Sequence, residues 1–399
     1  MEITGKKVVL PRAIWALGFV SLLMDVSSEL VHSLLPVFMV TTLGASALSL
    51  GLLEGFAEGT AAISKMFSGV LSDWLGKRKA LAVLGYGLSA LTKPFFPLAY
   101  SVEWVFTARI IDRIGKGIRG APRDALIGEI APQELRGAAY GLRQSLDTVG
   151  AFVGPGLAIL LMLVFAGNIR SVYWFAVIPA LLCVALLIFG VQEPERKKKG
   201  NEARFVLNKS ELKNLGRAYW GVVLIGCVLT LARFSEAFLI LRAQSVGLSS
   251  TWVPSVMVVM SAVYALAAYP AGILSDRMDR RFILMIGTGI LILADLVLAF
   301  TGTIWGVMIG VGLWGLHMGL SQGLLATLIA DTTPEAWRGT AFGMFNFISG
   351  FVLLAASALA GYLWGAYGPE GTFLAGAAFT SLAFAGLIAA RFHKKRSAV

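Results

Sequence analysis

A short sequence occurs twice in this chain, about half a chain length apart. Residues 69–73 read Gly-Val-Leu-Ser-Asp and residues 272–276 read Gly-Ile-Leu-Ser-Asp, and basic residues follow each copy. A second pair of related segments, 132–141 and 334–343, is separated by 202 residues, against 203 for the first pair. Two separate matches at nearly the same offset indicate a duplicated unit. We therefore expect a fold built from two similar halves.

The composition indicates that both halves are embedded in a lipid bilayer. Hydrophobic residues account for 57% of the 399 residues and charged residues for only 14%. Apolar stretches of about 20 residues recur, each long enough to cross a bilayer, and only helices satisfy the backbone of such segments in lipid. We predict an all-α polytopic membrane protein of two pseudo-symmetric six-helix bundles, with twelve transmembrane helices at 13–40, 46–72, 79–100, 104–124, 138–166, 171–191, 216–243, 250–275, 281–300, 304–330, 338–366 and 370–391.

The basic residues predict how the helices are oriented. Lysine and arginine gather at both termini and in alternate short loops, whereas the loops near 41–47, 101–103, 247–250 and 301–303 contain neither. Since cytoplasmic loops are enriched in these residues, we predict cytoplasmic termini and location in the plasma (inner) membrane. The net charge of +11 mostly reflects this topology. We expect no nucleic-acid binding, because the charges are scattered over the loops.

One long polar stretch separates the two halves. It runs from Glu193 to about Arg217 and is rich in lysine, arginine and glutamate. We predict an N-terminal bundle at 1–191, a cytoplasmic linker at 192–215 and a C-terminal bundle at 216–399.

Each copy of the repeated sequence lies where an even-numbered helix reaches the cytoplasm. Glycine allows a neighbouring helix to approach closely, and an aspartate at the membrane edge can accept hydrogen bonds from a helix N-terminus. Two such turns, one in each half, could hold the halves together on one face of the membrane and release them on the other. We predict a conformational latch formed by Gly69, Asp73, Gly76, Lys77 and Arg78 in the first half and by Gly272, Asp276 and Arg280 in the second.

The first copy, Gly69-x-x-x-Asp73-x-x-Gly76-Lys77-Arg78, resembles the loop two–three signature of the major facilitator superfamily. The second copy departs from that signature in having Asp279 in place of the second glycine. The resemblance extends over the whole chain. It implies a secondary transporter that works by alternating access in the lipid bilayer, with protons and a small-molecule substrate as partners. It also implies a monomer that is not an enzyme and needs no cofactor.

The fifth helix carries a glycine pattern that resembles the antiporter signature of the same superfamily. Its members are Gly141, Gly150, Gly154 and Pro155, although Gly156-Leu157-Ala158 departs from the family pattern. Such a helix presents a flat face, which we expect to pack against the other half, and can bend at proline. The resemblance favours drug:proton antiporter-type export over import, whereas a packing role for these residues is the alternative.

Many charged residues lie within the predicted helices of the first half. They include six acids and six bases: Asp25, Glu29, Glu54, Glu58, Asp112 and Asp147, with Lys65, Arg109, Arg113, Lys116, Arg119 and Arg143. Charges inside a bilayer are costly and need partners or a wet cavity. The equal numbers predict a buried ion-pair network that joins helices one, two, four and five.

Proton coupling is the function we expect of part of this network. A buried carboxylate beside an arginine can gain or lose a proton when substrate binds. The first candidates are Asp25 and Glu29, opposed to Arg109 and Arg113, and the wider predicted set adds His32, Glu54, Glu58, Asp112 and Asp147. A permanent ion-pair network is the alternative interpretation.

The second half has fewer such residues. Arg233 and Glu236 lie one turn apart on helix seven, and Trp314, His317 and Gln322 lie on helix ten. We predict that these five residues line the substrate cavity, with the second half supplying a mostly apolar, aromatic wall while the first half handles protons.

The sequence thus predicts a proton-coupled exporter of a small organic compound, drug-like or amphipathic. Transition-metal export is one alternative, because carboxylates and His32 could act as ligands, but the three histidines form no cluster and we predict no metal site. Organic-anion export is another, motivated by the bases of helix four. A sensor without transport predicts an appended soluble domain, and a membrane enzyme would have only Ser27 and Ser28 beside Glu29 as candidate nucleophiles.

Overall fold

The computed structural model describes residues 9–75, 77–193, 215–334 and 338–396. This described part of the chain contains helices and no strand, in agreement with the predicted all-α class. The long helices of the first half are α1 (Arg12–His32), α3 (Ala47–Leu75), α4 (Arg78–Thr92), α6 (Val102–Ile130), α7 (Arg136–Val164) and α8 (Ile169–Gly190). Those of the second half are α10 (Arg217–Ala232), α11 (Ala237–Ser245), α12 (Ser255–Arg277), α13 (Arg280–Phe300), α14 (Ile304–Asp331) and α15 (Arg338–Arg396).

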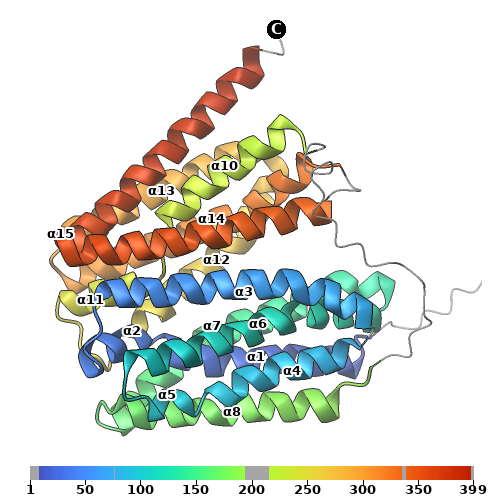
Figure 1. Cartoon of the computed structure of the whole chain (residues 1–399). Helices are drawn as coiled ribbons and strands as arrows, with labels where there is room; N and C mark the ends of the chain where they lie inside the picture. The colour runs from blue at the N-terminus through green and yellow to red at the C-terminus, as the bar shows by residue number, and fades with distance from the viewer. Residues whose placement is uncertain (1–8, 76, 194–214, 335–337, 397–399) are drawn as a thin grey trace, which may run out of the picture.

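The element α15 consists of two helices. Gly368 lies between them with φ 71° and ψ −173°, a backbone conformation that glycine adopts readily, and Pro369 follows it. Figure 1 shows the chain reversing direction there, with the last helix leaving at an angle. The two predicted helices 338–366 and 370–391 are therefore both present.

Length and apolarity alone would miss two of the twelve helices. Nine segments of the described chain are long and apolar enough to span a membrane, and one of them, Ala341–Ile388, includes both helices of α15. The helices α3 and α6 are not among the nine. These two contain most of the charged residues that face the centre of the first half.

Helices one and seven are interrupted at corresponding positions. After α1, the chain continues through the short α2 (Leu35–Val37) and a π-helical turn at Phe38–Thr42. Helix seven is interrupted between Ala232, which ends α10, and Ala237, which begins α11. The sequence interpretation missed both interruptions. Broken helices bring polar side chains and free backbone groups to the centre of a transporter, and here the interruptions lie beside the central cavity.

The two ends of the molecule differ in how the halves meet. At the end that contains α2 and α11, one apolar core includes residues of both halves, among them Phe38 and Phe238. At the other end, where α8 finishes and α10 begins, each half has its own core. We call the first the closed end and the second the linker end.

Backbone contact between α3 and α15 seals the closed end. These helices run side by side in Figure 1. A β-carbon on Gly361 would lie 2.5 Å from the carbonyl oxygen of Ala47 and 2.8 Å from the Cα of Leu48, and one on Gly55 would lie 2.9 Å from the Cα of Leu354. Glycine is required at these positions because the backbones of the two halves touch there.

The sequence repeat is also visible as a repeated ion pair at the linker end. Arg78 at the start of α4 pairs with Glu129 of α6 at 3.0 Å, and Arg280 at the start of α13 pairs with Asp331 of α14 at 2.6 Å. Both members of the second pair follow those of the first by 202 residues. The predicted latch itself stays a prediction, because Gly76 and the side chains of Asp73 and Asp276 lie outside the described residues.

Candidate functional site

A cavity of about 1060 Å³ lies between the two halves. It extends from the level of the interrupted helices toward the linker end. The first half contributes side chains from α1, α3 and α6, and the second contributes the segment between α10 and α11 together with α14 and the start of α15. The volume is that of a site for a small organic molecule.

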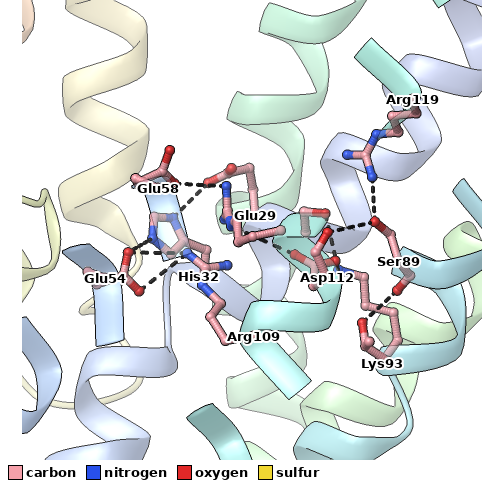
Figure 2. A network of polar contacts seen from close by, with 12 residues as sticks. Glu29, His32, Glu54, Glu58, Ser89, Lys93, Arg109, Asp112 and Arg119 are labelled. Atoms are coloured by element: carbon pink, nitrogen blue, oxygen red, sulfur yellow. Dashed lines mark hydrogen bonds and ion pairs between the residues drawn. The ribbon is translucent and has the colours of Figure 1, made fainter. Parts of the chain in front are cut away.

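The wall from the first half is a connected network of charged side chains, shown in Figure 2. Its centre is Glu54, which is 2% exposed. Both carboxylate oxygens of Glu54 accept hydrogen bonds from Nη2 of Arg109, at 3.3 and 3.2 Å. The Nε2 atom of His32 lies 3.3 Å from the same carboxylate, while its Nδ1 atom lies 3.5 Å from Glu29. His32 thus bridges carboxylates of α1 and α3.

The network continues through α6. Arg113 pairs with Glu58 at 2.9 Å and lies 3.8 Å from its neighbour Asp112. Asp112 in turn pairs with Lys93 at 3.0 Å, and the Lys93 ammonium also donates to the Ser28 hydroxyl at 3.1 Å. Of the network predicted to join helices one, two, four and five, the ion pairs between helices one, two and four are therefore present. Helix five joins helix four through Arg143, which lies 3.7 Å from Asp124.

Sequence reasoning missed Lys93. Its side chain lies fully inside the bundle between α4 and the short α5 (Phe95–Leu98). One signal was available, since a lysine followed by proline interrupts an otherwise apolar stretch.

The predicted coupling residues differ in their partners. Arg109 and Arg113 pair with glutamates of α3, so neither forms an ion pair with Asp25 or Glu29 among the described residues. Asp25 forms no hydrogen bond or ion pair with any described residue, although Lys116 and Arg119 interact with it electrostatically. Asp147 pairs with Arg143 on the same helix at 2.9 Å.

The glycines of α7 lie directly against these acids. A β-carbon on Gly150 would come within 2.9 Å of the Asp25 Cβ, and one on Gly154 within 2.8 Å of the Glu29 Cβ. The prediction that this face packs against the other half was therefore wrong for both glycines, because their partner is α1 of the same half. Pro155 is buried within a continuous α7, and Gly141 has no atom within 4 Å of its β-carbon position.

The wall from the second half is mostly aromatic and apolar. It includes Phe234, Trp314, Met318, Phe342, Phe345 and Phe347. The Trp314 indole donates from Nε1 to Oδ1 of Asp295 at 3.2 Å, and its ring lies 6.3 Å from that of Phe234. This arrangement agrees with the predicted apolar, aromatic wall of the second half, whereas proton handling by the first half stays a prediction.

Most of the predicted site residues line the cavity. From the first half these are Glu29, His32, Glu54, Glu58 and Arg113, and from the second Arg233, Glu236, Trp314 and Gln322. Arg109, Asp112, Asp25 and Asp147 do not line it. His317 also lies outside the lining, and its ring nitrogens contact the Gly287 carbonyl and the Ser321 hydroxyl.

One contact crosses the cavity between the halves. The Ser235 hydroxyl, in the interruption of helix seven, donates to Glu54 at 3.5 Å. Arg233 of the same segment donates to Ser321 at 3.3 Å. The interrupted helix seven therefore contacts the centre of the charged network, which the sequence did not indicate.

Two pseudo-symmetric helical halves around a central cavity, closed at one end, define a secondary transporter. Comparison with known proteins identifies the family. The Major Facilitator Superfamily model matches residues 17–249 and 237–398, so the chain belongs to that superfamily. The chain is a multi-pass membrane transporter of small molecules and not an enzyme, as predicted.

Related sequences cover most of the chain. It is 33% identical to an uncharacterized MFS-type transporter of Methanocaldococcus jannaschii over 373 aligned residues, and the alignment covers 92% of each chain. It is 25% identical over 385 residues to the inner membrane transport protein YajR of Escherichia coli, which covers 92% of this chain and 80% of that one.

Solved structures share the fold at low sequence identity. A mutant of the nucleoside transporter NupG superposes with a TM-score of 0.78 at 14% identity, and the superposition covers 94% of this chain and 99% of that one. A bacterial homolog of the human lysosomal transporter Spinster, in an inward-facing and occupied conformation, superposes with a TM-score of 0.76 at 17% identity, covering 95% and 96%.

Proposed function

We propose that this protein is a proton-coupled exporter of a small amphipathic organic compound. One observation supports this proposal above the others: the central cavity has a wall of ionisable side chains on the first half and an aromatic wall on the second. Buried ionisable groups in a transporter are candidates for proton binding, and aromatic surfaces bind apolar parts of a substrate. The export direction is supported by the glycine pattern of α7, which resembles that of drug:proton antiporters.

The proposal includes the orientation and the moving units. The basic loops support a cytoplasmic location for the linker end and for both termini, with the protein in the plasma membrane. With the opposite end closed, the structure then corresponds to an inward-facing state. The units 1–191 and 216–399 rock against each other, joined by 192–215, and the protein acts as a monomer.

An organic-anion exporter is the second candidate, and three cations favour it. Lys65, Lys116 and Arg233 line the cavity, and none of them lies within ion-pair distance of an acid in the described ranges. The four acids of the network, Glu29, Glu54, Glu58 and Asp112, each have a partner within it, so these three cations are available to a ligand. For the transition-metal alternative, the described residues contain no group of three potential ligands and give it no support.

The proposed function is tested by transport in proteoliposomes with an imposed pH gradient. Amphipathic compounds, organic anions and divalent metals are screened side by side, each with the gradient in both directions. We expect a gradient-dependent flux of an organic compound. If no compound moves under any gradient, the proton-coupled transport proposal is wrong.

Asp25→Asn and Glu29→Gln should uncouple transport from protons. Each amide keeps the shape of the side chain but cannot bind and release a proton, so we expect gradient-driven accumulation to be lost while exchange of substrate down its own gradient continues. Proton uptake and substrate flux are measured in the same liposomes. Glu103→Gln is the matched control, because Glu103 lies in the first turn of α6 outside the cavity. Full coupling in both Asp25→Asn and Glu29→Gln would contradict the assignment.

Phe347→Ala should change the substrate range more than proton movement. Phe347 lines the cavity on α15 and packs edge-to-face against Phe351 with ring centroids 5.0 Å apart, whereas Phe351 is not part of the lining. Loss of the cavity ring removes apolar contact area worth about 1.5–3 kcal/mol when fully buried, so we expect the affinity for aromatic substrates to fall by about tenfold or more. Competition binding across a compound panel measures this effect.

Phe351→Ala serves as the control for that experiment and should leave the panel unchanged. Phe347 gives a clearer test than Trp314, because removing the Trp314 indole would also remove a hydrogen bond to Asp295. If the Phe347 variant binds every compound of the panel with unchanged affinity but shows altered proton movement, the assignment of substrate binding to the second half and of proton handling to the first is wrong.

A further inference from the structure

Asp295 differs from the buried acids Glu54 and Asp112, which both have cationic partners. It lies in the middle of α13 with 0% of its surface exposed. Its Oδ1 atom accepts the hydrogen bond from the Trp314 indole at 3.2 Å, and its Oδ2 atom is buried without a hydrogen-bond partner among the described residues. Neither the charged network of the first half nor the proposed coupling residues include it.

The surroundings of Oδ2 are apolar. A β-carbon on Gly376 of α15 would lie 2.8 Å from this oxygen and 3.1 Å from the Phe234 ring, so this glycine makes room for the carboxyl group. Within the described chain, no lysine, arginine or histidine lies within ion-pair distance of Asp295. His317 on α14 faces Gly287 and Ser321 instead, and Arg233 and Glu236 beside Phe234 face the cavity.

This environment has a chemical consequence. An ionised carboxylate buried without a counter-charge costs several kcal/mol, and such a group becomes neutral by binding a proton. A proton on Oδ2 leaves Oδ1 free to accept from Trp314, in agreement with the observed contact. The first-half acids Glu54, Glu58 and Asp112 each have a cationic partner, and so burial does not require them to be neutral.

We propose that Asp295 is a proton-binding site of the second half, protonated in this conformation and connected to the substrate cavity by Trp314. The connection is direct, because Trp314 lines the cavity and contacts Phe234, whose neighbour Ser235 reaches Glu54 of the first half. A substrate that displaces the indole would remove the hydrogen bond to Asp295. Since the carboxyl group is fully buried here, its proton passes to water in another conformation. This inference deepens the proposed proton coupling. Only the role of Asp295 in transport rests on the proposed function, whereas the presence of a proton on Asp295 does not.

Infrared difference spectroscopy of the full-length protein in lipid nanodiscs tests the site without a substrate. At neutral pH we expect the carbonyl-stretch band of a protonated carboxylic acid, which a carboxylate does not show. Asp295→Asn should remove this band, and Trp314→Phe should shift it because the indole hydrogen bond is lost. Asp279→Asn, at the exposed start of the same helix, should leave it unchanged.

A spectrum of Asp295→Asn with the same band as the wild type would overturn the assignment. A band that does not move in Trp314→Phe would overturn the connection to the cavity, and this variant keeps the test valid even if Asp295→Asn does not fold. In proteoliposomes, Asp295→Asn should lose gradient-driven accumulation yet continue to exchange labelled for unlabelled substrate. If the wild type shows no response to a pH gradient, the proposed function fails, whereas the infrared result still decides whether Asp295 holds a proton.

Discussion

Replacing Arg109 with methionine is expected to destabilise the protein by about 3–5 kcal/mol and to abolish transport. Arg109 is 1% exposed and supplies two hydrogen bonds to the Glu54 carboxylate. Without the guanidinium, Glu54 would remain buried with His32 as its neighbouring base, and the cost of that uncompensated charge dominates the effect. The measurement is thermal unfolding of the purified protein in detergent, followed by transport in proteoliposomes.

Two further variants make this result interpretable. Arg109→Met combined with Glu54→Gln removes both charges, so we expect it to recover much of the stability but not the transport. Arg136→Met removes an exposed arginine at the start of α7 and should change stability by no more than about 0.5 kcal/mol. If Arg109→Met unfolds at the same temperature as the wild type, Glu54 is not held by this pair and the description of the network is wrong.

Gly361→Val is expected to prevent the closed end from closing. The new side chain would meet the backbone of Ala47 and Leu48 at 2.5–2.8 Å, and backbone atoms cannot move aside as a flexible side chain would. Overpacking of this kind costs about 1–3 kcal/mol, which shifts the balance between closed and open states by about 5- to 150-fold. We therefore expect loss of the state that is closed at this end, and loss of transport, with each half still folded.

Chemical labelling measures that shift. In a chain whose Cys183 and Cys227 have been replaced, a cysteine at Ser357 lies in the buried contact between α3 and α15. Its reaction with a membrane-impermeant maleimide should rise in the Gly361→Val background. Gly365→Val lies one turn further along the same helix, where no atom falls within 4 Å of the β-carbon position, and should leave the reaction unchanged. Equal labelling in both backgrounds would show that this contact does not control closure.

The fold could be predicted because its signals are repeated and long. Duplication, apolar length and loop charges together predicted the twelve helices. They include α3 and α6, which are not among the nine segments of the described chain that are long and apolar enough to be recognised as membrane spans. The interruptions after His32 and Ala232 escaped prediction. Pro36 at the first break was available as a signal, whereas the second break, residues 233–236, contains no proline or glycine. What stabilises them is the packing of α2 against α11, which depends on the tertiary structure.

The site was predictable as a set of residues but not as a set of pairs. Helical periodicity correctly gathered the charges of α1, α3 and α6 on facing surfaces. It could not assign Arg109 to Glu54 rather than to Asp25, because the choice depends on the rotation and depth of three helices. Asp112 pairs with Lys93, which follows α4 and so lies outside those three helices. The contact between the α7 glycines and α1 also depends on how the helices pack, which the sequence does not give.

The seal between α3 and α15 also determines how the transporter should respond to its surroundings. The described atoms nearest to its glycines belong to glycine, alanine, serine and leucine, none of which titrates, so we expect dispersion between the backbones to hold this contact closed. Salt and pH should therefore leave the strength of the seal itself nearly unchanged. Any sensitivity of the conformational equilibrium to protons must originate in the cavity, at residues that reach the seal only through the helices they share with it. We therefore expect proton binding to occur in the cavity and closure to occur at the contact between α3 and α15, two separate parts of the protein.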